Sequence, residues 1–284
     1  MELTEAITRR YSCRNFQRTP IAPGKLAELE TFAAGGAAPF GGRARLAFVR
    51  AQRRDGQELR GLGTYGFIRN PRGFIIGAID RATNPLEDYG YLLERLVLKA
   101  TTLGLGTCWL GGSFTQSSFA ARISPGPGEY LPAVIALGVP AGHKRLLEKA
   151  ARGLMKADSR KPWGELFFLE SPAAPLAPEK AGHLRQALEM VRLAPSATNQ
   201  QPWRLLAREN LSVVDFFLRR NKSYNENTFM IKADLQRIDL GIAMCHWDLA
   251  LATAGQRGNW SNGGPAGGRV PQGWEYSATW RRAG

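Results

Sequence analysis

"DYGYLLERLVLKATTLGLGTCWLGG" covers residues 88–112, and "DLGIAMCHWDLALATAGQRGNWSNGG" covers residues 239–264. The two segments superpose without gaps at an offset of 151 residues, which is 239 minus 88. Their identities include Asp, Gly and Trp as well as Leu: Asp88 with Asp239, Gly90 with Gly241, Leu98 with Leu249, Gly104 with Gly255, Trp109 with Trp260 and Gly112 with Gly263. Self-similarity at a fixed offset indicates duplication of one structural unit. We therefore expect two tandem, diverged copies of an α+β unit.

Hydrophobic periodicity and turn residues around this repeat predict further helices and strands. Helices are expected over residues 4–10, 23–34, 89–103, 181–193 and 234–255, and strands over 43–51, 72–80, 133–139 and 213–218. A Pro/Ala-rich stretch, residues 170–180, separates the two halves. We predict one domain over residues 1–170 and a second over residues 171–284.

The composition is that of a globular protein. The chain has 284 residues with 44% hydrophobic side chains, enough to bury a sizeable core. No segment is apolar over the length that a bilayer requires, and the first ten residues lack a signal-peptide core, so we expect a cytoplasmic protein with no membrane partner. Cys13, Cys108 and Cys245 are odd in number and scattered, which argues against a disulfide framework and a zinc site. No metal is expected.

The formal net charge of +14 is the most informative bulk property. A strongly basic surface attracts nucleic acid, acidic membranes or anionic ligands such as phosphorylated cofactors. We find no zinc-finger, RNP-type or basic-zipper pattern, so we expect no nucleic-acid partner. The densest basic run, residues 142–163, is interpreted as a solvated helix with a charged face.

Three clusters of residues could carry chemistry. Arg9, Arg10, Ser12 and Arg14 could clamp a phosphate with guanidinium forks and a hydroxyl, although a basic helix end bonded to its own carbonyls has the same pattern. Arg160 and Lys161 could add phosphate contacts, or could be an exposed pair in a basic run. The glycines of "GLGTCWLGG", residues 104–112, would let a flat ligand approach the backbone.

A second-half loop, "RLAPSATNQQPWRLL" over residues 192–206, is equally distinctive. The amides of Asn199 and Gln201 both donate and accept hydrogen bonds, which suits the edge of a heteroaromatic ring. The alternative is a rigid connection between a helix and a strand. The chain has no P-loop, nucleophile elbow or paired-carboxylate motif, so any enzyme chemistry would be carried by a cofactor.

Together, "TRRYSCRNF", "APSATNQQPW", the segment 88–112 and "SRKPW" resemble the nitroreductase family of FMN-dependent oxidoreductases. The resemblance implies an α+β fold with FMN held between two subunits. It implies that Arg10 and Ser12 hold phosphate, that Arg14 approaches the flavin ring, and that the backbone near Gly111 and Gly112 faces flavin N5. The cofactor-binding residues expected in this way are Arg9, Arg10, Ser12, Arg14, Trp109, Gly111, Gly112, Arg160, Lys161, Ser196, Asn199 and Gln201. Arg14, Gly111 and Gly112 are the residues expected to take part in catalysis.

The order of the motifs departs from the family. Family members carry the Asn/Gln loop soon after the Arg/Ser motif, but that position here is "AAPFGGRAR", and the loop occurs only in the second half. The first half thus lacks the Asn/Gln loop and the second half lacks the Arg/Ser motif, so each half has what the other lacks. We therefore expect a monomer that folds as a pseudo-dimer, as in the single-chain, fused branch of nitroreductases. Its one FMN site would combine Arg10, Ser12 and Arg14 of the first half with Asn199 and Gln201 of the second.

The resemblance further implies an oxidoreductase that takes a hydride from NAD(P)H and reduces a flat, electron-poor small molecule. Two other functions are compatible with the residues. One is a flavin-binding sensor or storage protein without turnover, and the other is a basic protein that binds nucleic acid or acidic lipid.

Overall fold

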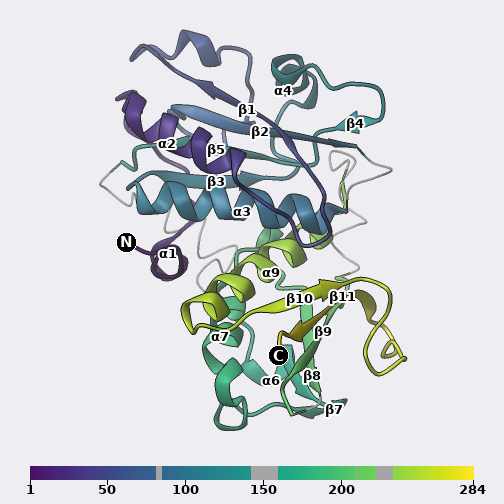
Figure 1. The fold of residues 1–284 in the computed structure, drawn as a ribbon. Helices are drawn as coiled ribbons and strands as arrows, with labels where there is room; N and C mark the ends of the chain where they lie inside the picture. Colours follow the sequence, from purple (N-terminus) through teal and green to yellow (C-terminus); the bar gives the residue numbers. More distant parts are fainter. Residues whose placement is uncertain (81–84, 142–158, 209, 222–232) are drawn as a thin grey trace.

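Two β-sheets and a layer of helices between them make up the structure, a computed structural model that describes residues 1–80, 85–141, 159–208, 210–221 and 233–284 (Figure 1). The central helices are α3 (Leu86–Thr102) and α9 (Leu235–Thr253), which pack against each other. These are the helices of the repeated segment. The expected α+β architecture with two related halves is confirmed, whereas most of the basic run 142–163 lies outside the described residues.

The first sheet has the order β1 (Arg45–Arg50), β2 (Gly73–Asp80), β5 (Val134–Gly138), β3 (Gly106–Leu110), and each neighbouring pair is antiparallel. The short strand β4 (Glu129–Tyr130) pairs with the end of β2. Seven of the eight residues of β2 are buried, because α3 covers one face of the sheet and a second apolar cluster covers the other. This explains its continuous apolar sequence.

The second sheet repeats this topology with the order β8 (Trp203–Arg208), β9 (Val213–Leu218), β11 (Glu275–Arg282), β10 (Gly258–Ser261). These pairs are also antiparallel, and α9 occupies the chain position between β9 and β10 that α3 occupies between β2 and β3. The repeat in the sequence is therefore a repeat of topology. The strands β3, β8, β10 and β11 were not among the predicted elements.

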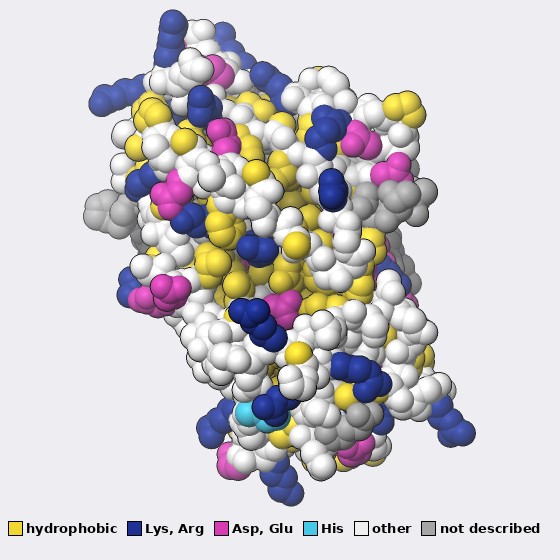
Figure 2. Space-filling view, viewed as in Figure 1, with side chains coloured by type: hydrophobic (Ala, Val, Ile, Leu, Met, Phe, Trp, Pro, Cys, Tyr) yellow, Lys and Arg dark blue, Asp and Glu magenta, His cyan; other side chains and the backbone are white. Residues whose placement is uncertain are grey.

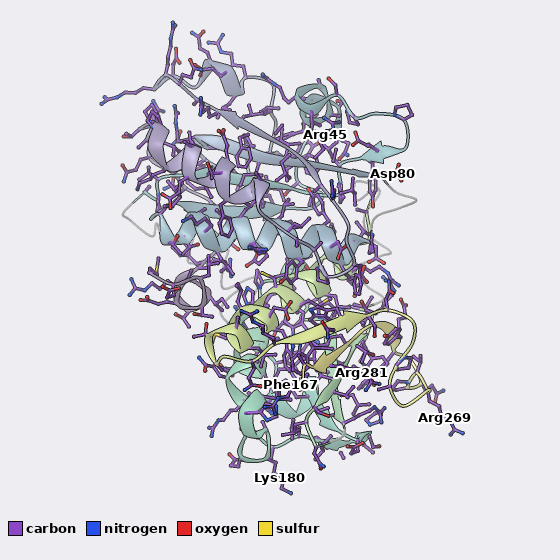
Figure 3. The ribbon with its side chains drawn as sticks, in the orientation of Figure 1. Arg45, Asp80, Phe167, Lys180, Arg269 and Arg281 are labelled. Carbon is purple, nitrogen blue, oxygen red and sulfur yellow. The ribbon has the colours of Figure 1, made fainter. Side chains whose placement is uncertain are left out.

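The segment that leads from the first half to the second adds two strands to the second sheet. After α6 (Trp163–Leu166), β6 (Phe167–Leu169) runs parallel to β8, and β7 (Ser171–Pro175) follows at the outer edge. The Phe167 ring is buried within the second half, whereas Lys180 projects from its surface (Figure 3). The chain thus enters the second sheet at residue 167, although residues up to 170 were assigned to the first domain. That division stays a prediction.

The remaining helices cover the sheets. In the first half they are α1 (Leu3–Arg9), α2 (Pro23–Ala34), the 3-10 turn η1 (Gln57–Leu59) and α4 (Gln116–Ile123). In the second half they are the 3-10 turns η2 (Pro178–Lys180), η3 (Gly182–Leu184) and η4 (Ala197–Asn199) with α7 (Arg185–Leu193). In the described part of the chain, no helix has the length and apolar character needed to cross a membrane.

One hydrophobic core joins the two halves. It contains Leu93 and Val97 of α3 together with Leu240, Ala243 and Trp247 of α9, all at most 1% exposed. Hydrophobic side chains also reach the surface along the middle of the molecule, whereas Lys and Arg stand out at the upper and lower ends (Figure 2). All three cysteines are buried. The halves therefore fold around a shared interior.

The repeated aspartates hold equivalent loops. The Asp88 carboxylate accepts hydrogen bonds from the backbone N–H groups of Phe40 (3.1 Å) and Gly42 (2.7 Å). The Asp239 carboxylate accepts the backbone N–H of Ala197 at 3.0 Å and 3.1 Å. Asp88 thus anchors the loop that precedes β1, and Asp239 anchors the loop that precedes β8, which is the predicted Asn/Gln loop.

Candidate functional site

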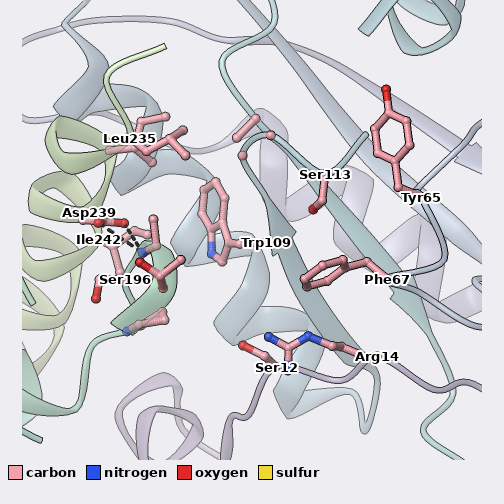
Figure 4. Close-up of a pocket in the computed structure, with 17 residues that line it drawn as sticks. Ser12, Arg14, Tyr65, Phe67, Trp109, Ser113, Ser196, Leu235, Asp239 and Ile242 are labelled. Atoms are coloured by element: carbon pink, nitrogen blue, oxygen red, sulfur yellow. Dashed lines mark hydrogen bonds between the residues drawn. The ribbon is translucent and has the colours of Figure 1, made fainter. Parts of the chain in front are cut away.

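A cavity of about 410 Å³ lies where the two halves meet (Figure 4). The first half lines it with Ser12, Arg14, Tyr65, Phe67, Trp109, Gly111, Gly112, Ser113 and Ala133. The second half lines it with Pro195, Ser196, Ala197, Thr198, Leu235, Ile238, Asp239 and Ile242. Its volume is within the range of small-molecule sites. Six of the twelve predicted site residues line it: Ser12, Arg14, Trp109, Gly111, Gly112 and Ser196.

The N-terminal motif reaches the cavity as an extended segment beside β3. Ser12 forms a parallel bridge with Thr107, the Cys13 N–H donates to the Thr107 carbonyl at 2.8 Å, and the Arg69 N–H donates to the Arg14 carbonyl at 2.8 Å. Alternate side chains of an extended segment point to opposite sides. Ser12 and Arg14 therefore face the cavity, while Cys13 is buried in the core.

Arg9 and Arg10 lie outside the cavity lining. Arg9 is exposed on α1 and forms an ion pair with Glu5 at 2.5 Å. The Arg10 side chain is 7% exposed, and its Nε lies 3.9 Å from Oε1 of the buried Glu94. Their predicted roles as phosphate ligands stay predictions.

Trp109, Gly111 and Gly112 come from the end of β3. The Trp109 indole N–H donates to Oε2 of Glu94 at 2.8 Å, which holds the ring at the cavity wall. Gly111 lies against the Leu235 side chain of α9, so the first-half turn touches the second-half helix. Both halves therefore contribute to this part of the cavity wall.

The Asn/Gln loop divides into two parts. Pro195 to Thr198 line the cavity, and the Ser196 hydroxyl accepts the Gln201 N–H at 2.8 Å. The Asn199 and Gln201 side chains turn to another segment of the chain. The Asn199 amide donates to the Ser159 carbonyl at 3.0 Å, and the Gln201 amide oxygen accepts the Lys161 N–H at 2.8 Å.

Hydrogen bonds to Gln201 and Leu193 therefore hold Lys161 and Arg160 near the residues that line the cavity. The Arg160 guanidinium donates to the Leu193 carbonyl at 3.3 Å and lies 3.5 Å from the Asn199 amide oxygen. Burial lowers the pKa of the Lys161 amine. The described structure thus brings four predicted residues together as one hydrogen-bonded group, Arg160, Lys161, Asn199 and Gln201, next to the six that line the cavity. Their contacts with a cofactor stay predictions.

Two ionisable side chains are among the described residues that line the cavity, Arg14 and Asp239. The Arg14 guanidinium lies 5.9 Å from the centre of the Phe67 ring, within cation–π range. Asp239 is 3% exposed, and burial raises the pKa of its carboxyl well above the ordinary value. Within the described parts of the chain, no three His, Cys, Asp or Glu side chains are grouped as metal ligands would be.

Several lining residues were missed by the sequence analysis. Tyr65 and Phe67 belong to the connection between β1 and β2, which no motif singled out. Leu235, Ile238, Asp239 and Ile242 belong to the first turns of α9. Asp239 was visible as a repeated residue, and Leu235, Asp239 and Ile242 have the spacing of one helix face. That spacing was the feature of the sequence from which this cavity-lining face of α9 could have been predicted.

Comparisons with known proteins agree with this architecture. A family model described as "Putative TM nitroreductase" matches residues 2–251. The crystal structure of a "putative nitroreductase" from Thermotoga maritima MSB8 superposes with a TM-score of 0.59 at 20% identity, covering 99% of this chain and 94% of that one. A search of curated proteins found no match.

Shorter structures match part of the chain. A nitroreductase family protein from Clostridium difficile 630 matches with a TM-score of 0.44 at 22% identity, covering 58% of this chain and 96% of that one. A second, from Desulfovibrio desulfuricans and described as in complex with FMN, has a TM-score of 0.39 at 20% identity, covering 52% and 94%.

Proposed function

This chain belongs to that nitroreductase family, and from this premise we propose that it is an FMN-dependent oxidoreductase with one flavin site between its two halves. The observation that carries the proposal is the cavity that joins Ser12 and Arg14 of the first half with the Ser196 loop of the second. We propose NAD(P)H as the electron donor and a flat, electron-poor small molecule as the acceptor.

The residues of the cavity fit a flavin nucleotide. Ser12 supplies a hydroxyl, Arg14 a fixed cation, and the backbone from Gly111 to Ser113 supplies polar groups beside an apolar wall of Leu235, Ile238 and Ile242. Arg160 and Lys161 would add positive charge for the phosphate from the adjoining hydrogen-bonded group. When bound, FMN supplies the hydride transfer between donor and acceptor.

The protein's part in this chemistry is orientation and electrostatics. Arg14 would stabilise negative charge that develops on the bound ring system, because its guanidinium is permanently charged and already held at the wall. The Asp239 carboxylate holds the Ala197 backbone, which keeps the second-half loop at the cavity. The apolar side chains of α9 exclude water from the same face.

The test is FMN binding to the full chain and to variants from each half. Arg14→Ala removes a charge-assisted contact and is expected to weaken FMN binding roughly ten- to hundredfold. Ser196→Ala, from the second half, is expected to weaken it less, roughly two- to tenfold. Arg185→Ala removes one charge from an exposed position outside the cavity lining and serves as the control.

Unchanged affinity in both Arg14→Ala and Ser196→Ala would refute the shared site. Equal losses in Arg14→Ala and Arg185→Ala would mean that net charge, and not this cavity, attracts the flavin. Steady oxidation of NADPH with a quinone acceptor distinguishes the enzyme from a flavin-binding protein without turnover, because the latter would bind FMN and leave NADPH unchanged.

A further inference from the structure

An aromatic turn at the mouth of the cavity is present in the first half and has no equivalent in the second. Residues 51–72 connect β1 to β2, whereas residues 209–212 connect the equivalent strands β8 and β9. The long connection carries Tyr65 and Phe67, and both line the cavity. Duplication of the unit therefore does not account for this turn, and its presence in the first half alone needs another explanation.

The two rings are unusually exposed. Tyr65 is 60% exposed and Phe67 is 47% exposed, and they are the two aromatics among the large hydrophobic side chains exposed in the described part of the chain. Exposed apolar surface at the rim of a cavity is typical of ligand contact. Figure 4 shows Phe67 above Arg14 and Tyr65 farther out. The rings thus extend the cavity wall outward.

The backbone holds this turn in a conformation that an aromatic residue rarely adopts. Tyr65 has a φ of 47° and is followed by Gly66 with a φ of 76°. Positive φ at a bulky residue is an outlier and persists only where surrounding contacts impose it. Here those contacts are hydrogen bonds from the Phe67 N–H to the Thr64 carbonyl (2.8 Å) and from the Thr115 N–H to the Gly63 carbonyl (3.0 Å).

The base of the turn is anchored in the apolar cluster that covers the outer face of the first sheet. Leu62 and Ile68, on either side of the turn, are buried in the second apolar cluster together with Phe114 and Phe119. The Arg122 guanidinium of α4 donates to the carbonyls of Glu58 (3.0 Å) and Arg60 (3.3 Å). The exposed rings are therefore displayed on a fixed support, which lowers the entropy cost of binding.

We propose that the turn from Tyr65 to Phe67 is the outer wall of the acceptor site and that Phe67 is a specificity-determining residue. This inference rests on the proposed function. Phe67 stacks on planar aromatic acceptors of two or more fused rings, which extend from the cavity past Trp109 to the rim. Monocyclic acceptors bind inside the cavity without reaching Phe67, so the turn favours the larger ones.

The experiment measures binding in the absence of an electron donor. A bicyclic naphthoquinone and a monocyclic benzoquinone are titrated into the FMN-loaded protein, and the dissociation constants are taken from the flavin absorbance change. Phe67→Leu keeps an apolar side chain and removes the aromatic face, whereas Phe67→Tyr keeps the face. Phe67→Leu is expected to weaken naphthoquinone binding roughly three- to tenfold and to leave benzoquinone binding unchanged, and Phe67→Tyr is expected to behave as wild type.

Val270→Ala, at an exposed hydrophobic residue outside the cavity lining, is the control and is expected to change neither constant. Equal naphthoquinone binding by wild type and Phe67→Leu would overturn the inference and leave the proposed function standing. The inference would also be overturned if Phe67→Leu weakened FMN binding as much as naphthoquinone binding, because Phe67 would then act on the cofactor through Arg14. A protein that binds no FMN would overturn the proposed function and this inference with it.

Discussion

Trp109 and Trp260 are equivalent residues of the repeat, and a carboxyl group of the preceding helix holds each of them. The Trp109 indole donates to Glu94 of α3 at 2.8 Å, and the Trp260 indole donates to Asp248 of α9 at 2.8 Å. A ring from the opposite half completes each contact. His246 Nε2 lies 3.1 Å from Glu94 Oε1, and the Tyr91 hydroxyl donates to Asp248 at 3.0 Å. Trp109 lines the cavity, whereas Trp260 packs against Phe216 in the second half.

The Asp248 contact predicts a pH-dependent stability. Burial raises the pKa of Asp248 to about 6, although the hydrogen bonds from Trp260 and Tyr91 oppose the shift. The folded pKa exceeds the unfolded value of roughly 4, so the contribution of Asp248 is greatest below pH 4 and is lost as the pH rises to 6. Asp248→Asn stays neutral and retains an acceptor oxygen. Relative to wild type, its free energy of unfolding is therefore expected to increase by about 2–3 kcal/mol between pH 4 and pH 7.

Urea denaturation of both proteins across this pH range checks the expectation. Glu2→Gln, at an exposed N-terminal residue, is the control and should follow the wild-type curve. Parallel curves for Asp248→Asn and wild type would show that the pKa of Asp248 is the same in the folded and unfolded protein, and would contradict the expectation.

The contact between α3 and α9 is reciprocal, as the repeat requires. Gly90 of α3 faces the backbone carbonyl of Ile238, and Gly241 of α9 faces the backbone carbonyl of Glu87. Glu87 and Ile238 are themselves equivalent positions, since they differ by the offset of 151. The Arg237 guanidinium adds a hydrogen-bonded ion pair to Glu87 at 2.6 Å. The two helices thus approach at one point through a pair of glycines.

Alanine at this point is expected to destabilise the protein. A Cβ at Gly90 or Gly241 would collide with a backbone carbonyl oxygen of the facing helix, and a packed backbone cannot move away as a flexible side chain can. Gly90→Ala and Gly241→Ala should each lower the free energy of unfolding by about 2–4 kcal/mol, measured by denaturant or thermal unfolding. Gly24→Ala is the control, because no atom lies within 4 Å of the added Cβ. A loss below 1 kcal/mol in both central variants would contradict the close helix contact.

Across the whole molecule, the two halves share one hydrophobic core and both line the same cavity. The core joins both halves without interruption, and β6 passes from the first half into the second sheet. Both halves line the cavity proposed to bind FMN, so each chain already contains every described part of that site.

We therefore expect a monomer that binds one FMN. Sedimentation or light scattering should give a mass near the 31.2 kDa of the chain, and flavin absorbance should give one FMN per chain. Two FMN per chain would mean that the second half builds a site of its own. A dimer that loses FMN when it is diluted to monomers would mean that the site lies between chains.

The architecture could be predicted from the repeat. Periodicity located α3 and α9, and the offset of 151 residues related them, because a duplicated helix retains the residues that pack it: Asp88, Gly90 and their equivalents. The strands β3 and β10 were not predicted, because their short segments, GTCWL and GNWS, begin with Gly and carry polar residues in place of an alternating apolar pattern. Pairing with neighbouring strands, and not local propensity, determines them.

For the site, local sequence indicated which loops meet but not which side chains face the cavity. Ser12, Arg14 and Ser196 could be named because they occur in distinctive motifs. Asn199 and Gln201 occur in the same loop, yet the folded chain turns their amides toward Ser159 and Lys161. Phe67 has no motif, and only the support of Ile68 and the 115–122 region brings it to the rim. The direction of a side chain depends on contacts with segments far away in the sequence, and those contacts exist only after the two halves have packed.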